Sequence, residues 1–193
     1  MTCIVYIHGF NSSPQSAKAR QLQAWAASQR PDLDIRVPAL PMDPEKALAL
    51  LESCVQSCPP ATGLIGSSMG GFFANVLAAR HGLPAVLINP AVHPHRLLAR
   101  HLGENRNYHT GEVSELLPGH VGFLERTELP PATPSRLRVL LETGDETLDY
   151  REAERFYAGC RVEVTPGGSH AYEGFLAALP SIVEFLEQQA FVP

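Results

Sequence analysis

Gly66-Ser67-Ser68-Met69-Gly70 lies where a short apolar run, residues 63–65, meets a segment of helical periodicity, residues 69–80. A serine on a sharp turn from strand to helix has a strained backbone, and the residues two positions before and after it crowd together. Gly66 and Gly70 occupy those two positions, where a side chain would clash. The stretch therefore predicts a nucleophile elbow with Ser68 at its tip, although a plain glycine-serine turn would fit the same pattern.

Strand-like and helical segments alternate along the whole chain. The predicted strands are residues 3–7, 35–37, 63–65, 85–89, 137–143 and 161–165. The predicted helices are residues 16–28, 44–57, 69–80, 150–157 and 172–189. Such alternation is typical of right-handed βαβ units, which build a mainly parallel, doubly wound sheet with helices on both faces. We expect one α/β domain over residues 1–193, with its ligand beyond the carboxyl ends of the strands.

The composition argues against several classes of function. The chain has 193 residues, a formal net charge of −5 and only two lysines, Lys18 and Lys46. Without a basic cluster, it offers no surface for nucleic acid or an anionic membrane. No signal peptide or run of transmembrane length is visible. The four cysteines have no zinc-knuckle or Cys-x-x-Cys spacing, so we expect a cytoplasmic protein without structural disulfides.

One connection is too long for an ordinary loop. Residues 93–135 separate the fourth and fifth predicted strands and are interrupted by glycines and prolines. An insertion at this place is positioned to cover the carboxyl edge of the sheet as a cap. Its apolar residues either dock it onto the core or line an acyl pocket. They are Leu97, Leu98, Leu102, Leu116, Leu117, Phe123 and Leu124.

Most of the histidines also fall in this insertion. They are His93, His95, His101, His109 and His120. Their spacing matches no helical pair of ligands four residues apart with an acidic third ligand. We therefore expect no metal site there.

Two further segments supply partners for Ser68. Asp145 follows the fifth predicted strand, and His170 follows the sixth in a Gly-Gly-Ser-His loop flexible enough to aim it over the sheet. A serine hydroxyl needs a base to take its proton, and the base needs an acid to hold its tautomer. The order Ser68, Asp145, His170 is that of α/β-hydrolases. Asp149, in contrast, stands where the next helix begins and is expected to cap it.

Backbone donors for an oxyanion come from two places in such a site. One is the N–H of the residue after the nucleophile, here Met69, and the other belongs to the loop after an early strand. His8-Gly9-Phe10 supplies that loop, and we expect the second donor to be the N–H of Phe10. His8 itself is expected to brace the loop by hydrogen bonding.

Five motifs together resemble the YqiA/YcfP-type small bacterial esterases of the α/β-hydrolase superfamily. They are Tyr6-Ile7-His8-Gly9-Phe10-Asn11-Ser12-Ser13-Pro14, Gly66-Ser67-Ser68-Met69-Gly70-Gly71, Asn89-Pro90-Ala91-Val92, Thr143-Gly144-Asp145-Glu146-Thr147-Leu148-Asp149-Tyr150 and Gly167-Gly168-Ser169-His170. The resemblance spans nearly the whole chain. It implies a compact α/β-hydrolase fold and esterase activity on short-chain or acyl-thioester substrates, with no cofactor.

The residues thus predict a serine carboxylester or thioester hydrolase that acts on a small molecule through an acyl-enzyme. Two alternatives stay open. An acyltransferase would use the same three residues and differ only in excluding water. A hydrolase-fold module that binds a ligand without turning it over is the second, since a fold alone does not fix a function.

Overall fold

A computed structural model, which describes residues 2–190, contains a sheet of six parallel strands. The strands are β1 (Cys3–Ile7), β2 (Asp34–Arg36), β3 (Thr62–Ser67), β4 (Ala85–Ile88), β7 (Leu137–Glu142) and β8 (Arg161–Thr165). Their order is β2-β1-β3-β4-β7-β8, and each neighbouring pair is parallel. The prediction of a parallel α/β sheet is therefore confirmed.

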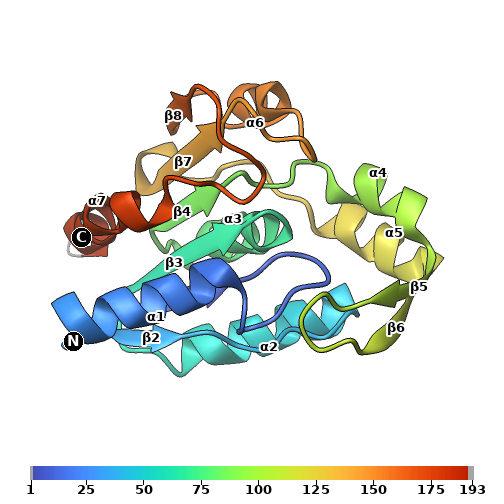
Figure 1. Cartoon of the computed structure of the whole chain (residues 1–193), viewed down its shortest axis with the longest axis horizontal. Coiled ribbons are helices and arrows are strands. Elements are labelled where there is room, and N and C mark those ends of the chain that lie inside the picture. Colours follow the sequence, from blue (N-terminus) through green and yellow to red (C-terminus); the bar gives the residue numbers. More distant parts are fainter. Residues whose placement is uncertain (1, 191–193) are drawn as a thin grey trace.

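Helices cover both faces of this sheet (Figure 1). The helices outside the insertion are α1 (Ala17–Gln29), α2 (Pro44–Gln56), α3 (Met69–His81), α6 (Tyr150–Phe156) and α7 (Phe175–Ala190). Alternate residues of β1 join different cores, as the period of two along a strand requires. Ile4 and Tyr6 pack in the core with α1 and α7, whereas Val5 and Ile7 pack in the core with α2 and α3. Burial on both faces explains why the strands are continuous apolar runs.

The insertion between β4 and β7 has its own secondary structure. It consists of α4 (Pro94–Leu98), a 3₁₀ turn (Ala99–His101), the antiparallel hairpin of β5 (Gly103–Arg106) and β6 (Val113–Leu116), α5 (Pro118–Thr127) and a second 3₁₀ turn (Pro134–Arg136). Helix α4 packs against α5, and α5 contacts α2. The Tyr108 N–H donates to the Asn11 carbonyl at 2.8 Å, so the hairpin is fastened to the loop after β1.

The predicted elements are all present, and most of their ends lie within two residues of the predicted ones. The last helix begins at Phe175, not at residue 172, because Tyr172 has a φ of 55° and lies outside the helical region. Strand β4 ends at Ile88 because Asn89 has a φ of 38°. The β5–β6 hairpin was not predicted. No helix within residues 2–190 is long and apolar enough to span a bilayer.

Candidate active site

Ser68 lies on the turn between β3 and α3. Its φ is 56°, in the region that non-glycine residues rarely adopt. A Cβ at Gly66 would collide with the backbone of Gly70, and a Cβ at Gly70 would collide with the carbonyl of Ile7. The two glycines of the motif are therefore required by the close approach of α3 to β3 and β1.

The three residues in hydrolase order lie within hydrogen-bond distance of one another. His170 Nε2 is 3.0 Å from Ser68 Oγ, and His170 Nδ1 is 2.8 Å from Asp145 Oδ2. The Asp145 side chain is 2 % exposed and that of His170 is 23 % exposed. When Nδ1–H donates to the carboxylate, Nε2 has a free lone pair directed at the serine hydroxyl.

The second oxygen of Asp145 is held by the backbone. Oδ1 accepts hydrogen bonds from the N–H groups of Thr147 and Leu148, both at 2.8 Å. Burial works to raise the pKa of Asp145, but the hydrogen bond from His170 and these backbone donors outweigh it and hold the pKa below its usual range. Asp145 is thus ionised at neutral pH, as an acceptor for His170 must be.

Asp149 has the capping role that the sequence predicts. It is the N-cap of α6, where its Oδ1 accepts from the Arg151 N–H at 3.0 Å. The two aspartates after β7 therefore face different partners.

The loop after β1 lies directly beside Ser68. A Cβ added to Gly9 would be only 3.3 Å from the Ser68 Cβ, so the Gly9-Phe10 backbone passes close to the hydroxyl. Met69 is the first residue of α3, and the N–H groups of a first helical turn have no partner within the helix. The N–H groups of Phe10 and Met69 thus stay candidates for binding an oxyanion.

His8 braces this loop. Its Nε2 accepts from the Leu40 N–H at 3.3 Å, and its Nδ1 is 3.0 Å from the Gly9 carbonyl. Burial lowers the pKa of His8, and the neutral tautomer with a proton on Nδ1 satisfies both contacts.

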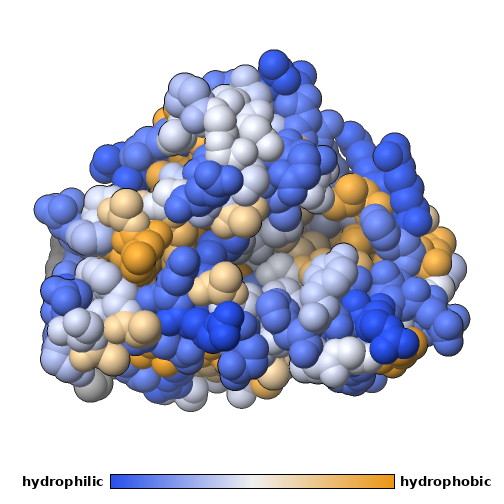
Figure 2. Space-filling model, viewed as in Figure 1, coloured by the Kyte–Doolittle hydropathy of each residue, from blue (hydrophilic) through white to orange (hydrophobic). Residues whose placement is uncertain are grey.

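A cavity of about 650 Å³ opens over Ser68. Ser68, His170, Phe10 and Met69 contribute to its lining, and one wall comes from the insertion. The insertion residues in that wall are Pro94, Leu97, Leu98, His101, Tyr108 and His109. Figure 2 shows the surface hollowed where the insertion faces the rest of the molecule. The insertion therefore overhangs the carboxyl edge of the sheet.

Histidines of the insertion pair with carboxylates. His93 Nδ1 is 2.6 Å and His95 Nδ1 3.7 Å from the Glu128 carboxylate, while His120 Nε2 is 3.9 Å from Asp43. Over residues 2–190, there is no group of three or more His, Cys, Asp or Glu side chains that could hold a metal ion.

A family model covers almost the entire chain. The Uncharacterised protein family UPF0227 matches residues 3–187. The chain belongs to this family. The resemblance read from the five motifs is thereby confirmed.

Solved structures with the same fold come from several organisms. Est1E from Butyrivibrio proteoclasticus, in a structure with bound ferulic acid, has 14% identity and a TM-score of 0.76, with 98% of this chain and 89% of that chain covered. The mouse alpha/beta hydrolase domain-containing protein 10 has 16% identity and a TM-score of 0.75, with 97% and 90% covered. A Paleococcus ferrophilus monoacylglycerol lipase has 13% identity and a TM-score of 0.70, with 97% and 94% covered. At such identities the likeness shows the α/β-hydrolase fold alone.

Sequence reasoning missed Glu142, the last residue of β7. Its side chain is buried, and Oε2 accepts from the N–H groups of Ser169 at 2.8 Å and Glu173 at 3.0 Å, while Oε1 accepts from Gly174 at 3.1 Å. The loop that carries His170 is therefore wrapped around one carboxylate. An acidic residue inside the apolar run 137–143 is the signal that could have revealed it.

Two other side chains hold the same loop. Asn89 donates from Nδ2 to the Ser169 carbonyl at 3.0 Å and accepts from the Glu142 N–H at 3.0 Å. Lys18 donates from Nζ to the Ala171 carbonyl at 2.6 Å. Burial lowers the pKa of Lys18, and the charges of Glu142 and Asp145 oppose that shift. The backbone on both sides of His170 is thus fixed by side chains from α1, from β7 and from the residue that follows β4.

Glu142→Gln is expected to lower kcat roughly 10- to 100-fold with little change in KM, because an amide NH₂ would face backbone donors and displace His170. Steady-state kinetics on a chromogenic ester measure kcat and KM separately, and circular dichroism checks the fold. Glu154→Gln, an exposed change of the same charge on α6, is the control and should behave as wild type. Equal kinetics in the two variants would contradict the role of Glu142.

Asp145→Asn is expected to lower turnover roughly 10³- to 10⁴-fold, because the amide no longer favours the tautomer with a proton on Nδ1. Asp149→Asn should cost little in rate or melting temperature, since asparagine also caps helices. Kinetics and thermal melts on both variants distinguish the two aspartates. A severe rate loss confined to Asp149→Asn would reverse the assignment.

Proposed function

We propose that the protein is a serine esterase that hydrolyses small carboxylic esters or acyl thioesters. The observation that carries the proposal is the continuous hydrogen-bond chain Ser68–His170–Asp145 at the floor of the large cavity. An ordinary buried histidine would satisfy backbone groups, whereas this one joins a strained, cavity-lining serine to an ionised aspartate.

In the proposed reaction, Ser68 Oγ attacks the acyl carbonyl while His170 Nε2 takes the hydroxyl proton. The Asp145 carboxylate holds the imidazole and stabilises its positive charge. The N–H groups of Phe10 and Met69 bind the oxygen that becomes negative in the tetrahedral intermediate. His170 then returns the proton to the leaving alcohol or thiol, and an acyl group remains on Ser68.

Water completes the cycle by the same steps. His170 takes a proton from a water molecule, the hydroxide attacks the acyl-enzyme, and Ser68 leaves with the proton. Water can reach the imidazole because the His170 side chain is partly exposed in the cavity. This access favours hydrolysis over transfer of the acyl group to another acceptor.

We further propose that residues 1–193 form one α/β domain and that this enzyme acts in the cytoplasm. The four cysteines are free, and burial together with the neighbouring Cys58 raises the pKa of Cys3, which keeps that thiol protonated and unreactive. Unreactive reduced thiols are typical of proteins in a reducing compartment.

Ser68→Ala is expected to reduce ester turnover on the order of 10⁴-fold or more while the melting curve is preserved, because alanine removes only the hydroxyl. Hydrolysis of a p-nitrophenyl ester measures the loss. Ser67→Ala is the internal control, since the Ser67 hydroxyl interacts with that of Tyr6, and this variant should keep most of its activity. A Ser68→Ala enzyme with a tenth of the wild-type rate would exclude Ser68 as the nucleophile.

The rate should decline at acid pH with the uptake of one proton, because only neutral His170 can act as the base. Asp145 does not add a second proton on this limb, since its pKa is lowered and it stays ionised until the pH falls below the usual aspartate value of ~3.9. A plot of log kcat/KM against pH should thus have a slope of one. A slope of two above pH ~4 would show that Asp145 takes up a proton together with His170.

A further inference from the structure

A second, smaller cavity of about 170 Å³ lies beside the large one. Five residues line both cavities, and so form the wall between them; these are Gly9, Phe10, Ser12, Met69 and Leu98. Ser68 and His170 line only the large cavity. The proposed mechanism makes no use of the smaller one.

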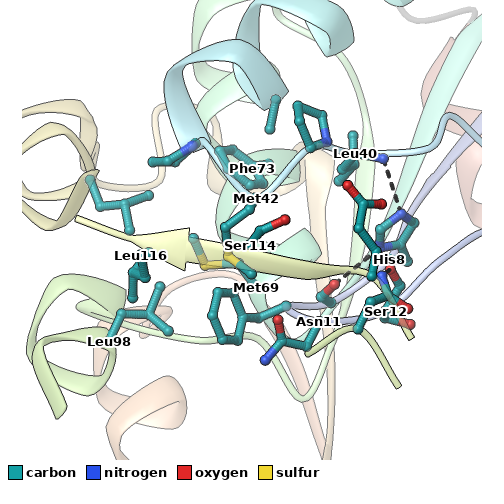
Figure 3. A pocket seen from close by; sticks show the side chains of 18 residues that line it. His8, Asn11, Ser12, Leu40, Met42, Met69, Phe73, Leu98, Ser114 and Leu116 are labelled. Atoms are coloured by element: carbon teal, nitrogen blue, oxygen red, sulfur yellow. Dashed lines mark hydrogen bonds between the residues drawn. The ribbon is translucent and has the colours of Figure 1, made fainter. Parts of the chain in front are cut away.

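The smaller cavity is apolar at one end and polar at the other (Figure 3). Leu98 and Leu116 lie at the first end, and His8, Asn11 and Ser12 lie at the second. Besides Phe10 and Met69 of the shared wall, six larger apolar side chains line this cavity. They come from the segment just before α2, from α3 and from the insertion, and they are Leu40, Met42, Phe73, Leu98, Leu116 and Leu124. For comparison, an engineered cavity of about 150 Å³ lined by leucine, isoleucine and phenylalanine binds benzene.

We propose that this cavity receives the acyl group of the substrate, and that it selects neutral, apolar acyl groups of about six carbons. The inference rests on the proposed esterase function and names its substrate class. Phe10 and Met69 carry the two candidate N–H donors, and the same residues form the wall of the cavity. A carbonyl bound by those donors has its acyl chain at this wall, and the leaving group is left on the side of His170.

Two side chains of the wall, those of Phe10 and Met69, can move aside. Met69 has three rotatable bonds, and Phe10 is only partly buried. Glu112 also contributes to the lining, so an acyl chain that ends in a carboxylate is disfavoured by like charge. The preferred occupant is therefore uncharged.

Several apolar residues of the insertion line at least one of the two cavities. Of its seven apolar residues named from the sequence, Leu98, Leu116 and Leu124 line the smaller cavity, and Leu97 lines the larger one. Phe123 packs against the core cluster, to which Leu98, Leu116 and Leu124 also belong, and Leu102 and Leu117 are exposed. Docking onto the core and lining of a pocket thus occur together in Leu98, Leu116 and Leu124.

Ser114 offers a way to fill the cavity without disturbing the core. It lies on β6, is half-buried, and projects into the cavity in Figure 3. Its neighbour Val113 is 49% exposed on the opposite face of the same strand. Ser114→Phe is therefore the filling variant, and Val113→Phe is the matched control with the same added side chain.

The test compares p-nitrophenyl acetate, hexanoate and dodecanoate. Wild type and Val113→Phe should prefer hexanoate by kcat/KM, and Ser114→Phe should lower the ratio of hexanoate to acetate by about tenfold or more, since room for even one methylene changes discrimination by that order. If Ser114→Phe and Val113→Phe have the same ratio, the inference is overturned while the esterase function stands. If no ester is turned over, the esterase function fails.

A binding measurement tests whether the smaller cavity holds the acyl chain, without relying on turnover. Hexanamide, which has the acyl chain but a poor leaving group, should raise the melting temperature of wild type and Val113→Phe more than acetamide does. Ser114→Phe should lose that difference. An equal response to the two amides in wild type, or an unchanged difference in Ser114→Phe, would overturn the inference whatever the kinetics show.

Discussion

The close contact between the backbones of α3 and β1 is the constraint on which the rest of the site depends. Gly70 lies against the Ile7 carbonyl with no room for a side chain. Because the start of the helix touches the end of the strand, the loop that follows β1 passes beside Ser68, and Met69 at the start of α3 lines the same cavity as Gly9. A larger residue at Gly70 would separate the serine from that loop before it affected any chemistry.

The histidine side of the site depends on a buried charge. A carboxylate away from water is costly unless hydrogen bonds and opposite charges compensate it. Glu142 receives three backbone N–H groups, and Lys18 adds a positive charge nearby. A Cβ at Gly168 would collide with the Glu142 carboxylate, so this glycine permits packing, whereas the sequence had suggested that it makes the loop flexible.

The residues that could be predicted from the sequence follow strands with a recognisable pattern, and those that it missed act through contacts between distant segments. Ser68, Asp145 and His170 each follow a strand with its own apolar pattern, so their approach to one edge follows from parallel topology. Glu142 acts on the backbone of a distant loop, and such a contact leaves no periodic trace in the sequence. The strands of the β5–β6 hairpin are short, and their residues, GENR and VSEL, lack the alternation of apolar and polar side chains that predicts a strand. The smaller cavity arises where that hairpin meets the loop after β1, a contact that only the assembled fold defines.

The place of His170 after the last strand of the sheet also sets the order in which the site is assembled during synthesis. A chain emerging from the ribosome presents the serine turn first and the aspartate much later, and the loop around Glu142 closes only when Glu173 and Gly174 have been made. Helix α7, which packs on α1 and β3, then holds that loop against the body. A growing chain of this protein therefore carries an incomplete set of candidate catalytic groups until Gly174 has been made.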